Sequence, residues 1–232
     1  MPQTDPHAVP GAAPDAELTK TGTTTVAVST PDSVVLAADR RASAGGHFVT
    51  SKDTQKVEAV HPTAGVTIAG AVGSLQDYTR RLEAEADRYA IRRGDPPSMH
   101  AFATFAGNLL RNGPYRAVQS TLGGVDADGS HVYDLDAGGA VLEAPYAANG
   151  SGTQFALGVL ERDYRPDLST DEARAVAARA VESAIERDTA SGNGVTVAEV
   201  TADGVDFRTY DDPRDVRREL ETDTDDASEE VA

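Results

Sequence analysis

The chain of 232 residues has no cysteine and no long apolar run. Without thiols it can form no disulfide bond, thiolate metal site or cysteine nucleophile, and it suits a reducing cytoplasm. A membrane-spanning helix needs about 20 consecutive apolar residues, and no segment approaches that length. Residues 1–22 also lack the apolar centre of a secretory signal. We therefore expect a cytoplasmic protein that does not enter a membrane.

Lysine is also scarce, with three residues against 18 arginines, and the formal net charge is −17. A negative field of this size repels nucleic acid and anionic lipid. Acidic excess with little lysine indicates adaptation to high salt, where carboxylates keep the surface hydrated and ions screen their repulsion. An ordinary acidic protein with an acidic tail is the alternative. The scarcity makes each lysine that is present (Lys20, Lys52 and Lys56) a candidate for a specific task.

The apolar periodicity switches between the two-residue alternation of strands and the three-to-four-residue repeat of helices. It predicts strands over residues 24–29, 33–38, 56–60, 65–71, 117–125, 130–134, 140–147, 195–201 and 205–210. It predicts helices over 74–94 and 98–112, one through Phe155 and Leu160, one opened by the capping box of Ser169 and Glu172, and a short one near 216–220. Residues 42–46 are small and flexible and are predicted to form a loop.

Strands, two helices, strands, two helices and a final strand pair therefore follow one another. Each group of strands alone would leave one sheet face bare, and 232 residues suffice for one sizeable domain. Two stacked antiparallel sheets, covered outside by helix pairs, would bury every apolar face. The predicted fold is an α+β, four-layer αββα sandwich over residues 23–210, followed by an acidic tail at 211–232.

Residues 21–26 read Thr-Gly-Thr-Thr-Thr-Val. One interpretation is the start of an edge strand, since threonine suits strands and glycine marks turns. The other is a cleavage point between Gly22 and Thr23, because an N-terminal threonine combines a nucleophilic hydroxyl with an α-amine that acts as its base. The α-amine pKa of about 7.7–8.0 suits that role near neutral pH. Residues 1–22 would then be a propeptide rather than a floppy tail.

Other candidate residues lie at predicted strand ends. Asp39 follows the second strand and Lys56 opens the third, so an Asp–Lys pair could lie beside Thr23. The lysine charge would lower the pKa of the Thr23 amine and hydroxyl, and Asp39 would orient the lysine. The alternative is a surface ion pair of little energetic value.

A further set lies in loops. Ser151 precedes a helix, where an N-cap is the commoner role, and Asp188 and Ser191 share a polar loop after another helix. These two hydroxyls and one carboxylate could instead hold the α-amine and relay its proton. Gly70 could donate a backbone N–H to an oxyanion, or could be a packing glycine.

Several motifs occur along the chain in a fixed order. They are Gly22-Thr23-Thr24-Thr25-Val26, Ala38-Asp39-Arg40-Arg41-Ala42-Ser43, Thr67-Ile68-Ala69-Gly70-Ala71-Val72-Gly73, Gly123-Gly124-Val125-Asp126, Gly150-Ser151-Gly152 and Arg187-Asp188-Thr189-Ala190-Ser191-Gly192. With them, the chain from Thr23 to about Tyr210 resembles a β subunit of the archaeal-type proteasome core particle, a threonine peptidase. The fold of that family is the αββα sandwich of N-terminal-nucleophile hydrolases, in agreement with the periodicity.

The resemblance implies a role for each matching residue. Thr23 matches the catalytic threonine that the subunit exposes by cutting the Gly22–Thr23 bond itself. Asp39 and Lys56 match the acid and the lysine of the catalytic centre. The polar set around the α-amine is matched by Ser151, Asp188 and Ser191, and the oxyanion donor by Gly70.

The resemblance also implies a specificity pocket, matched by Ala42, Thr54, Glu58, Ile68 and Val72. The placement of Lys56 and Glu58 depends on one extra residue in the loop over 44–48, and Lys52 is the rival for the catalytic lysine. Glu58 is an unexpected residue in such a pocket.

The family further implies two stacked rings of seven β subunits, capped by α-subunit rings and fed with unfolded proteins by an ATPase unfoldase. Neither a metal nor an organic cofactor is implied. Two alternatives stay open: a non-catalytic structural ring subunit, and an amidase of the same fold that acts on small molecules.

Overall fold

The computed structural model describes residues 22–44, 48–70, 72–115 and 118–229, with the backbone alone for Val72 and residues 223–229. The predicted leader, apart from Gly22, lies outside the described residues. So do Ala71 and Ala117, at which two predicted strands were expected to end and to begin.

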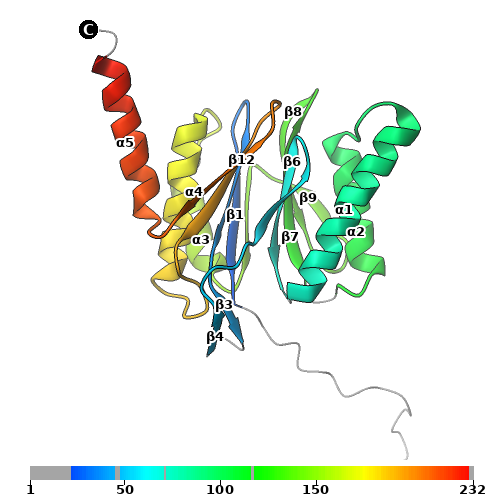
Figure 1. Ribbon diagram of the computed structural model, residues 1–232, viewed down its shortest axis with the longest axis horizontal. Coiled ribbons are helices and arrows are strands. Elements are labelled where there is room, and N and C mark those ends of the chain that lie inside the picture. The colour runs from blue at the N-terminus through cyan, green and yellow to red at the C-terminus, as the bar shows by residue number, and fades with distance from the viewer. Residues whose placement is uncertain (1–21, 45–47, 71, 116–117, 230–232) are drawn as a thin grey trace, which may run out of the picture.

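Two five-stranded antiparallel sheets form the centre of the molecule (Figure 1). The first has the order β10-β1-β2-β11-β12, made of β10 (Tyr146–Gly150), β1 (Thr24–Ser29), β2 (Val34–Asp39), β11 (Val195–Val200) and β12 (Val205–Tyr210). The second has the order β5-β6-β7-β8-β9, made of β5 (Val57–His61), β6 (Ala64–Ala69), β7 (Gln119–Asp126), β8 (Gly129–Leu135) and β9 (Val141–Glu143). A small hairpin of β3 (Ala42–Ala44) and β4 (Phe48–Ser51) projects at one end.

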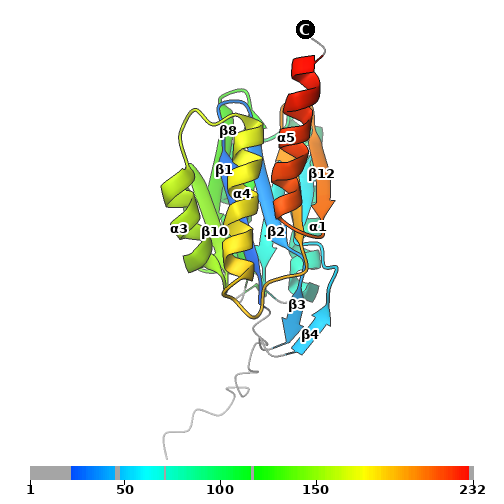
Figure 2. The same ribbon diagram turned by 90° about the vertical axis from the view of Figure 1, so that its left-hand side faces the viewer.

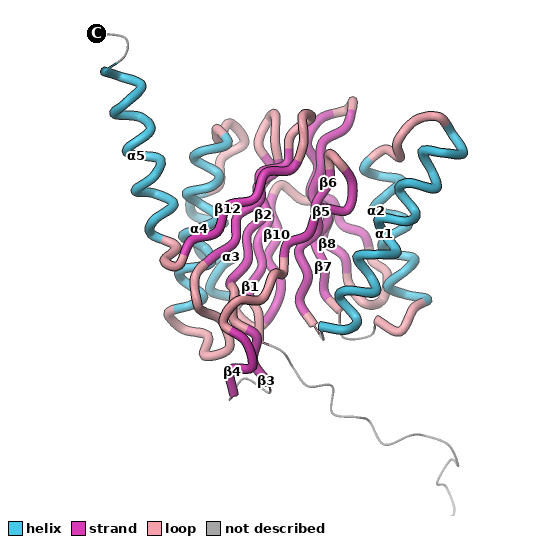
Figure 3. The backbone as a smooth tube through the Cα atoms, in the orientation of Figure 1, coloured by secondary structure: helices cyan, strands magenta, loops and turns pink. Residues whose placement is uncertain are grey.

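Helices cover the outer faces of both sheets, as the tube view in Figure 3 shows. The second sheet is covered by α1 (Val72–Arg93) and α2 (Met99–Asn112), and the first by α3 (Thr153–Asp163) and α4 (Thr170–Ile185). Helix α5 (Arg214–Glu229) lies beside α4 (Figure 2). The predicted four-layer αββα sandwich is confirmed.

Three apolar layers hold the sandwich together. One lies between the first sheet and α3 and α4, and another between the second sheet and α1 and α2. The third joins the two sheets and consists of alanine and valine side chains around Leu36. Because these side chains are small, the sheets approach closely, and the end of β2 lies near the start of β5. This junction carries the candidate site.

Helix α4 has a buried face that is rich in alanine. Its fully buried residues include Ala173, Ala177, Ala180 and Ala184, which allow it to pack closely on β1, β2 and α3. The predicted capping box is also confirmed: Ser169 Oγ accepts from the N–H of Glu172 at 3.2 Å, and Glu172 Oε2 accepts from the N–H of Ser169 at 2.9 Å.

Two predictions from the sequence were wrong, one for a connection between the two sheets and one for the small hairpin. The single strand expected over 140–147 is two strands, β9 and β10, which belong to different sheets. Pro145 between them has no N–H for a ladder, and its carbonyl accepts from the N–H of Ser29 at 2.9 Å. The loop expected over 42–46 begins with strand β3, whose pairing with β4 shifts register between Ala42 and Ser43.

Helix α5 is longer than the short helix expected near 216–220. A buried arginine explains its docking: Arg174 of α4 is 3% exposed and its guanidinium donates to Asp171, Glu219 and the Tyr210 hydroxyl. Val216 of α5 is fully buried. Among the described residues, no helix combines the length and the apolar character needed to cross a membrane.

Candidate active site

Thr23 lies directly before β1 and is 3% exposed. Its Oγ1 donates to the carbonyl oxygen of Gly22 at 2.6 Å, and its N–H donates to Ser151 Oγ at 3.2 Å. The N–H of Gly22 donates to Ser43 Oγ at 3.2 Å. The Thr23 hydroxyl therefore lies against the carbonyl group of the Gly22–Thr23 bond, and hydrogen bonds hold the backbone on both sides of that bond.

A glycine is required where β10 ends beside Thr23. Gly150 pairs with Thr24 across the β1–β10 ladder and has φ of 99°, in the left-handed region. A Cβ on Gly150 would lie 2.0 Å from the Thr23 carbonyl oxygen. Because Gly150 has no side chain, β10 can pass close to Thr23. The next residue, Ser151, then lies against the N–H of Thr23.

Ser151, Asp188 and Ser191 form one hydrogen-bonded group, although they come from three places in the sequence. Ser151 Oγ and Ser191 Oγ donate to the same Asp188 oxygen, at 2.6 Å and 2.7 Å. Ser191 Oγ also lies 2.8 Å from Thr24 Oγ1. The group therefore reaches β1 at two successive residues, through Ser151 at Thr23 and through Ser191 at Thr24.

A buried ion pair joins the two sheets beside this group. Lys56, just before β5, donates from Nζ to Asp39 Oδ1 at 2.7 Å, and the side chains are 3% and 0% exposed. Asp39, the last residue of β2, also accepts from the N–H of Thr24 at 2.9 Å, Gly192 at 2.8 Å and Arg41 at 3.1 Å. The Lys56 ammonium further donates to the carbonyl oxygen of Arg41. Asp39 thus connects the lysine to the residue that follows Thr23.

Burial governs the ionisation of this pair. It lowers the pKa of the Lys56 ammonium below its ordinary value, against the charges of Asp39 and Asp188, which raise that pKa. Burial likewise raises the pKa of the Asp39 carboxyl, against the charge of Lys56 and the hydrogen bonds from Lys56, Thr24 and Gly192. A buried ammonium that Asp39 links to Thr24 favours the neutral form of an amine that becomes free at the neighbouring Thr23.

Lys56 and Lys52, the two candidates for the catalytic lysine, differ in burial and in contacts. Lys52 is exposed and lies in the turn after β4, whereas Lys56 is 4% exposed and is bound to Asp39. The structure therefore brings Lys56, rather than Lys52, into contact with Asp39, and the catalytic role of this lysine stays a prediction.

Sequence reasoning missed four contributors to the site. Ser43, in the stretch expected to be a loop, holds the N–H of Gly22, and the Thr24 hydroxyl contacts Ser191. Arg41 and Gly192 supply backbone groups to the Asp39–Lys56 pair. The motif around Asp39 already contained Arg41. Its contribution could not be predicted, because the residue type does not show which backbone groups form hydrogen bonds.

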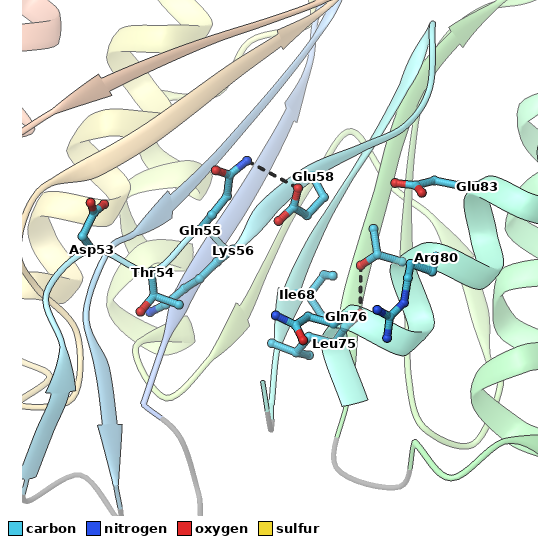
Figure 4. Close-up of a pocket in the computed structure, with 11 residues that line it drawn as sticks. Asp53, Thr54, Gln55, Lys56, Glu58, Ile68, Leu75, Gln76, Arg80 and Glu83 are labelled. Carbon is cyan, nitrogen blue, oxygen red and sulfur yellow. Dashed lines mark hydrogen bonds between the residues drawn. The ribbon is translucent and has the colours of Figure 1, made fainter. Parts of the chain in front are cut away.

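A pocket of about 530 Å³ opens beside Lys56 (Figure 4). Its walls come from the segment before β5, from β5 and β6, and from α1, and they comprise Asp53, Thr54, Gln55, Lys56, Glu58, Ile68, Leu75, Gln76, Thr79, Arg80 and Glu83. Three of the residues expected to form a specificity pocket are among them: Thr54, Glu58 and Ile68. The α1 residues were not expected, although Gln76, Thr79, Arg80 and Glu83 follow a helical repeat that marks one polar face.

The other two residues expected in the specificity pocket, Ala42 and Val72, are not among the described residues that line it. Ala42 is 7% exposed in β3. Val72 is the first residue of α1, and its side chain lies outside the described part of the structure. Gly70 follows β6 with φ of 147°, a backbone shape that favours glycine, and its role as an oxyanion donor stays a prediction.

Sequence comparison matches most of the chain to known proteins. The family model described as "Proteasome subunit" matches residues 19–200. The chain is 54% identical over 198 residues to "Proteasome subunit beta 2" of Haloarcula marismortui, covering 85% of this chain and 86% of that protein. It is 55% identical over 193 residues to "Proteasome subunit beta" of Halorubrum lacusprofundi, covering 83% and 79%. The relatives come from halophilic archaea, which confirms the source expected from the acidic, lysine-poor composition.

Proposed function

The chain belongs to the proteasome subunit family, and from this premise we propose that it is a catalytic β subunit, a threonine endopeptidase that activates itself by cutting the Gly22–Thr23 bond. The observation that carries the proposal is the contact of Thr23 Oγ1 with the Gly22 carbonyl at 2.6 Å, beside a buried lysine and a Ser–Asp–Ser group. Nucleophile, proton acceptor and charge are thus gathered around one bond.

Self-cleavage would begin with attack of Thr23 Oγ1 on the Gly22 carbonyl carbon. The C–N bond to Thr23 breaks, the hydroxyl proton ends on the departing nitrogen, and an ester joins Gly22 to Oγ1. Water then hydrolyses the ester, leaving a carboxylate on Gly22 and a free α-amine on Thr23. The hydrogen bonds from Gly22 to Ser43 and from Thr23 to Ser151 support this step because they fix the bond in place for attack.

Substrate cleavage would use the same atoms. The free α-amine accepts the Oγ1 proton while Oγ1 attacks a peptide carbonyl, and it then returns the proton to the leaving amine. Water hydrolyses the acyl ester. Ser151 and Asp188 would orient the amine, and Lys56 would keep it neutral; the hydrogen bonds from Thr23 to Ser151 and from Ser151 to Asp188 support this role.

The proposal extends to the assembly. Membership of the proteasome subunit family means that the chain assembles into a ring-shaped core particle. We propose that seven copies form each β ring, that α-subunit rings cap two such rings, and that an ATPase unfoldase supplies unfolded proteins in the cytoplasm. A peptidase enclosed in this way would spare folded proteins, which cannot reach Thr23.

The mass of the β chain in the purified native particle tests the proposal. We expect the mature chain to begin at Thr23 and to form a covalent adduct there with a threonine-directed inhibitor. A chain that keeps residues 1–22 and forms no adduct would instead favour the non-catalytic ring subunit. A small oligomer that hydrolyses only small amides would favour the amidase.

Replacing Gly22 with alanine is expected to slow self-cleavage at least about tenfold, equivalent to about 1.4 kcal/mol. The new Cβ would lie 1.7 Å from Ala190 Cβ, a side chain that is 5% exposed, so the segment cannot keep its position. Conversion of precursor to mature chain, followed by gel electrophoresis, measures the effect. Gly158→Ala is the matched control because a Cβ there meets nothing within 4 Å. Equal processing rates in the two variants would contradict the attack geometry.

A further inference from the structure

The pocket beside Lys56 combines two carboxylates with a small apolar surface. Ile68 and Leu75 contribute its apolar surface, and Glu58 and Glu83 bring carboxylates from β5 and α1. In Figure 4 the Glu83 carboxylate points back toward Glu58 across the pocket. A pocket of about 530 Å³ falls within the usual range of about 300–1,000 Å³ for ligand sites, so one long side chain of a substrate fits in it.

The other acidic and basic groups of the pocket are largely occupied elsewhere. Asp53 pairs with Arg40 at 2.6 Å, and Lys56 pairs with Asp39 at 2.7 Å. The Arg80 guanidinium points toward Leu75 and Gln76 in Figure 4, away from both glutamates. Among the described residues that line the cavity, Glu58 and Glu83 are therefore the carboxylates that form no ion pair.

Glu58 itself has only a neutral partner among the described residues. Gln55 Nε2 lies 3.4 Å from Glu58 Oε2, and no described lysine or arginine forms an ion pair with this half-buried carboxylate. Burial raises the pKa of Glu58 above its ordinary value, and the nearby charge of Glu83 raises it further. A cation bound beside Glu58 would offset both the desolvation of its carboxylate and its repulsion from Glu83, since a half-buried carboxylate is stabilised by an opposite charge.

We propose that this pocket selects an arginine or lysine side chain of the substrate, held by Glu58 and Glu83, so that the enzyme cleaves unfolded proteins beside basic residues. The inference rests on the proposed peptidase function. The methylene stem of the basic residue lies along Ile68 and Leu75, and its cationic head reaches the two carboxylates. Aromatic or aliphatic side chains fill the same space but leave the Glu58 carboxylate desolvated without a charged partner.

The test is a comparison of kcat/KM for fluorogenic peptides that carry arginine, leucine or tyrosine at the scissile bond. The native particle containing the unaltered chain is compared with particles containing Glu58→Gln, Glu83→Gln or the control Glu161→Gln, an exposed residue of α3. Active sites are counted by covalent labelling of Thr23, so that poorly assembled variants do not distort the rates.

We expect the arginine peptide to be the best substrate, at least about tenfold above leucine. Glu58→Gln should lower kcat/KM for arginine about tenfold, mainly through KM, and leave leucine and tyrosine within about twofold. Glu83→Gln should have the same direction with a smaller effect, and Glu161→Gln should change nothing.

The outcomes distinguish a failure of the pocket assignment from a failure of the proposed peptidase function. Cleavage of leucine or tyrosine peptides with no preference for arginine, or an arginine rate untouched by Glu58→Gln, overturns the pocket assignment alone. Absence of cleavage of every peptide by the unaltered particle overturns the proposed function, and the pocket assignment with it.

Discussion

Thr23→Ala should leave the chain unprocessed and reduce peptide hydrolysis by about 10⁴-fold or more. The substitution removes the proposed nucleophile, Thr23 Oγ1, which lies 2.6 Å from the Gly22 carbonyl oxygen. Ser151, Asp188, Asp39 and Lys56 stay in place but have no nucleophile to activate. Hydrolysis of a fluorogenic peptide and the mass of the β chain in purified particles measure the two losses separately.

Two companion variants show which function the hydroxyl serves. Thr23→Ser keeps the hydroxyl, so we expect both processing and hydrolysis to persist at reduced rates. The Thr23→Ala substitution in a chain that begins at residue 23 supplies a free amine without a hydroxyl, and we expect no hydrolysis from it. Activity in this shortened variant would show that another group attacks the substrate, and the mechanism proposed above would then be wrong.

The sequence predicted the layers of the fold because each layer follows a local rule. The apolar pattern predicted the strands β1, β2, β11 and β12, and the capping box at Ser169 predicted the start of α4. The errors occur where the outcome depends on distant contacts. Residues 140–147 were predicted to form one strand, but the chain crosses from one sheet to the other at Pro145, and only the packing of the sheets determines that crossing.

The candidate site was predictable in its side chains and not in its backbone. Asp39 and Lys56 were expected from the segments that resemble the family, and the scarcity of lysine supported the choice of Lys56. The three N–H groups that Asp39 accepts come from Thr24, Arg41 and Gly192. These hydrogen bonds depend on how β1, β2 and the loop before β11 meet, so residue types could not predict them.

The pocket shows the same division between local and distant information. Glu58 and Ile68 were expected from the segments that resemble the family, and the structure places both in the pocket walls. Its α1 wall was missed because the helix was read only for its core-facing residues. The polar repeat of Gln76, Arg80 and Glu83 becomes informative once α1 is known to pack beside β5 and β6.

Lys56→Met should abolish activity and also destabilise the fold, by about 3–5 kcal/mol, because it leaves Asp39 as an uncompensated buried carboxylate. The Asp39 side chain is fully buried and the pair is 2.7 Å apart, so water cannot replace the lost ammonium. Chemical denaturation measures the stability, and peptide hydrolysis per labelled Thr23 measures the activity. Lys52→Met is the matched control, since Lys52 is exposed and lies four positions earlier in the chain.

The double variant Lys56→Met with Asp39→Asn separates the two roles of the lysine. Removing both charges eliminates the unpaired carboxylate, so we expect much of the lost stability to return. Activity should not return, because no cation then lowers the pKa of the Thr23 amine and hydroxyl. If the double variant recovers hydrolysis together with stability, Lys56 only supports the fold, and the assignment of its charge to catalysis fails.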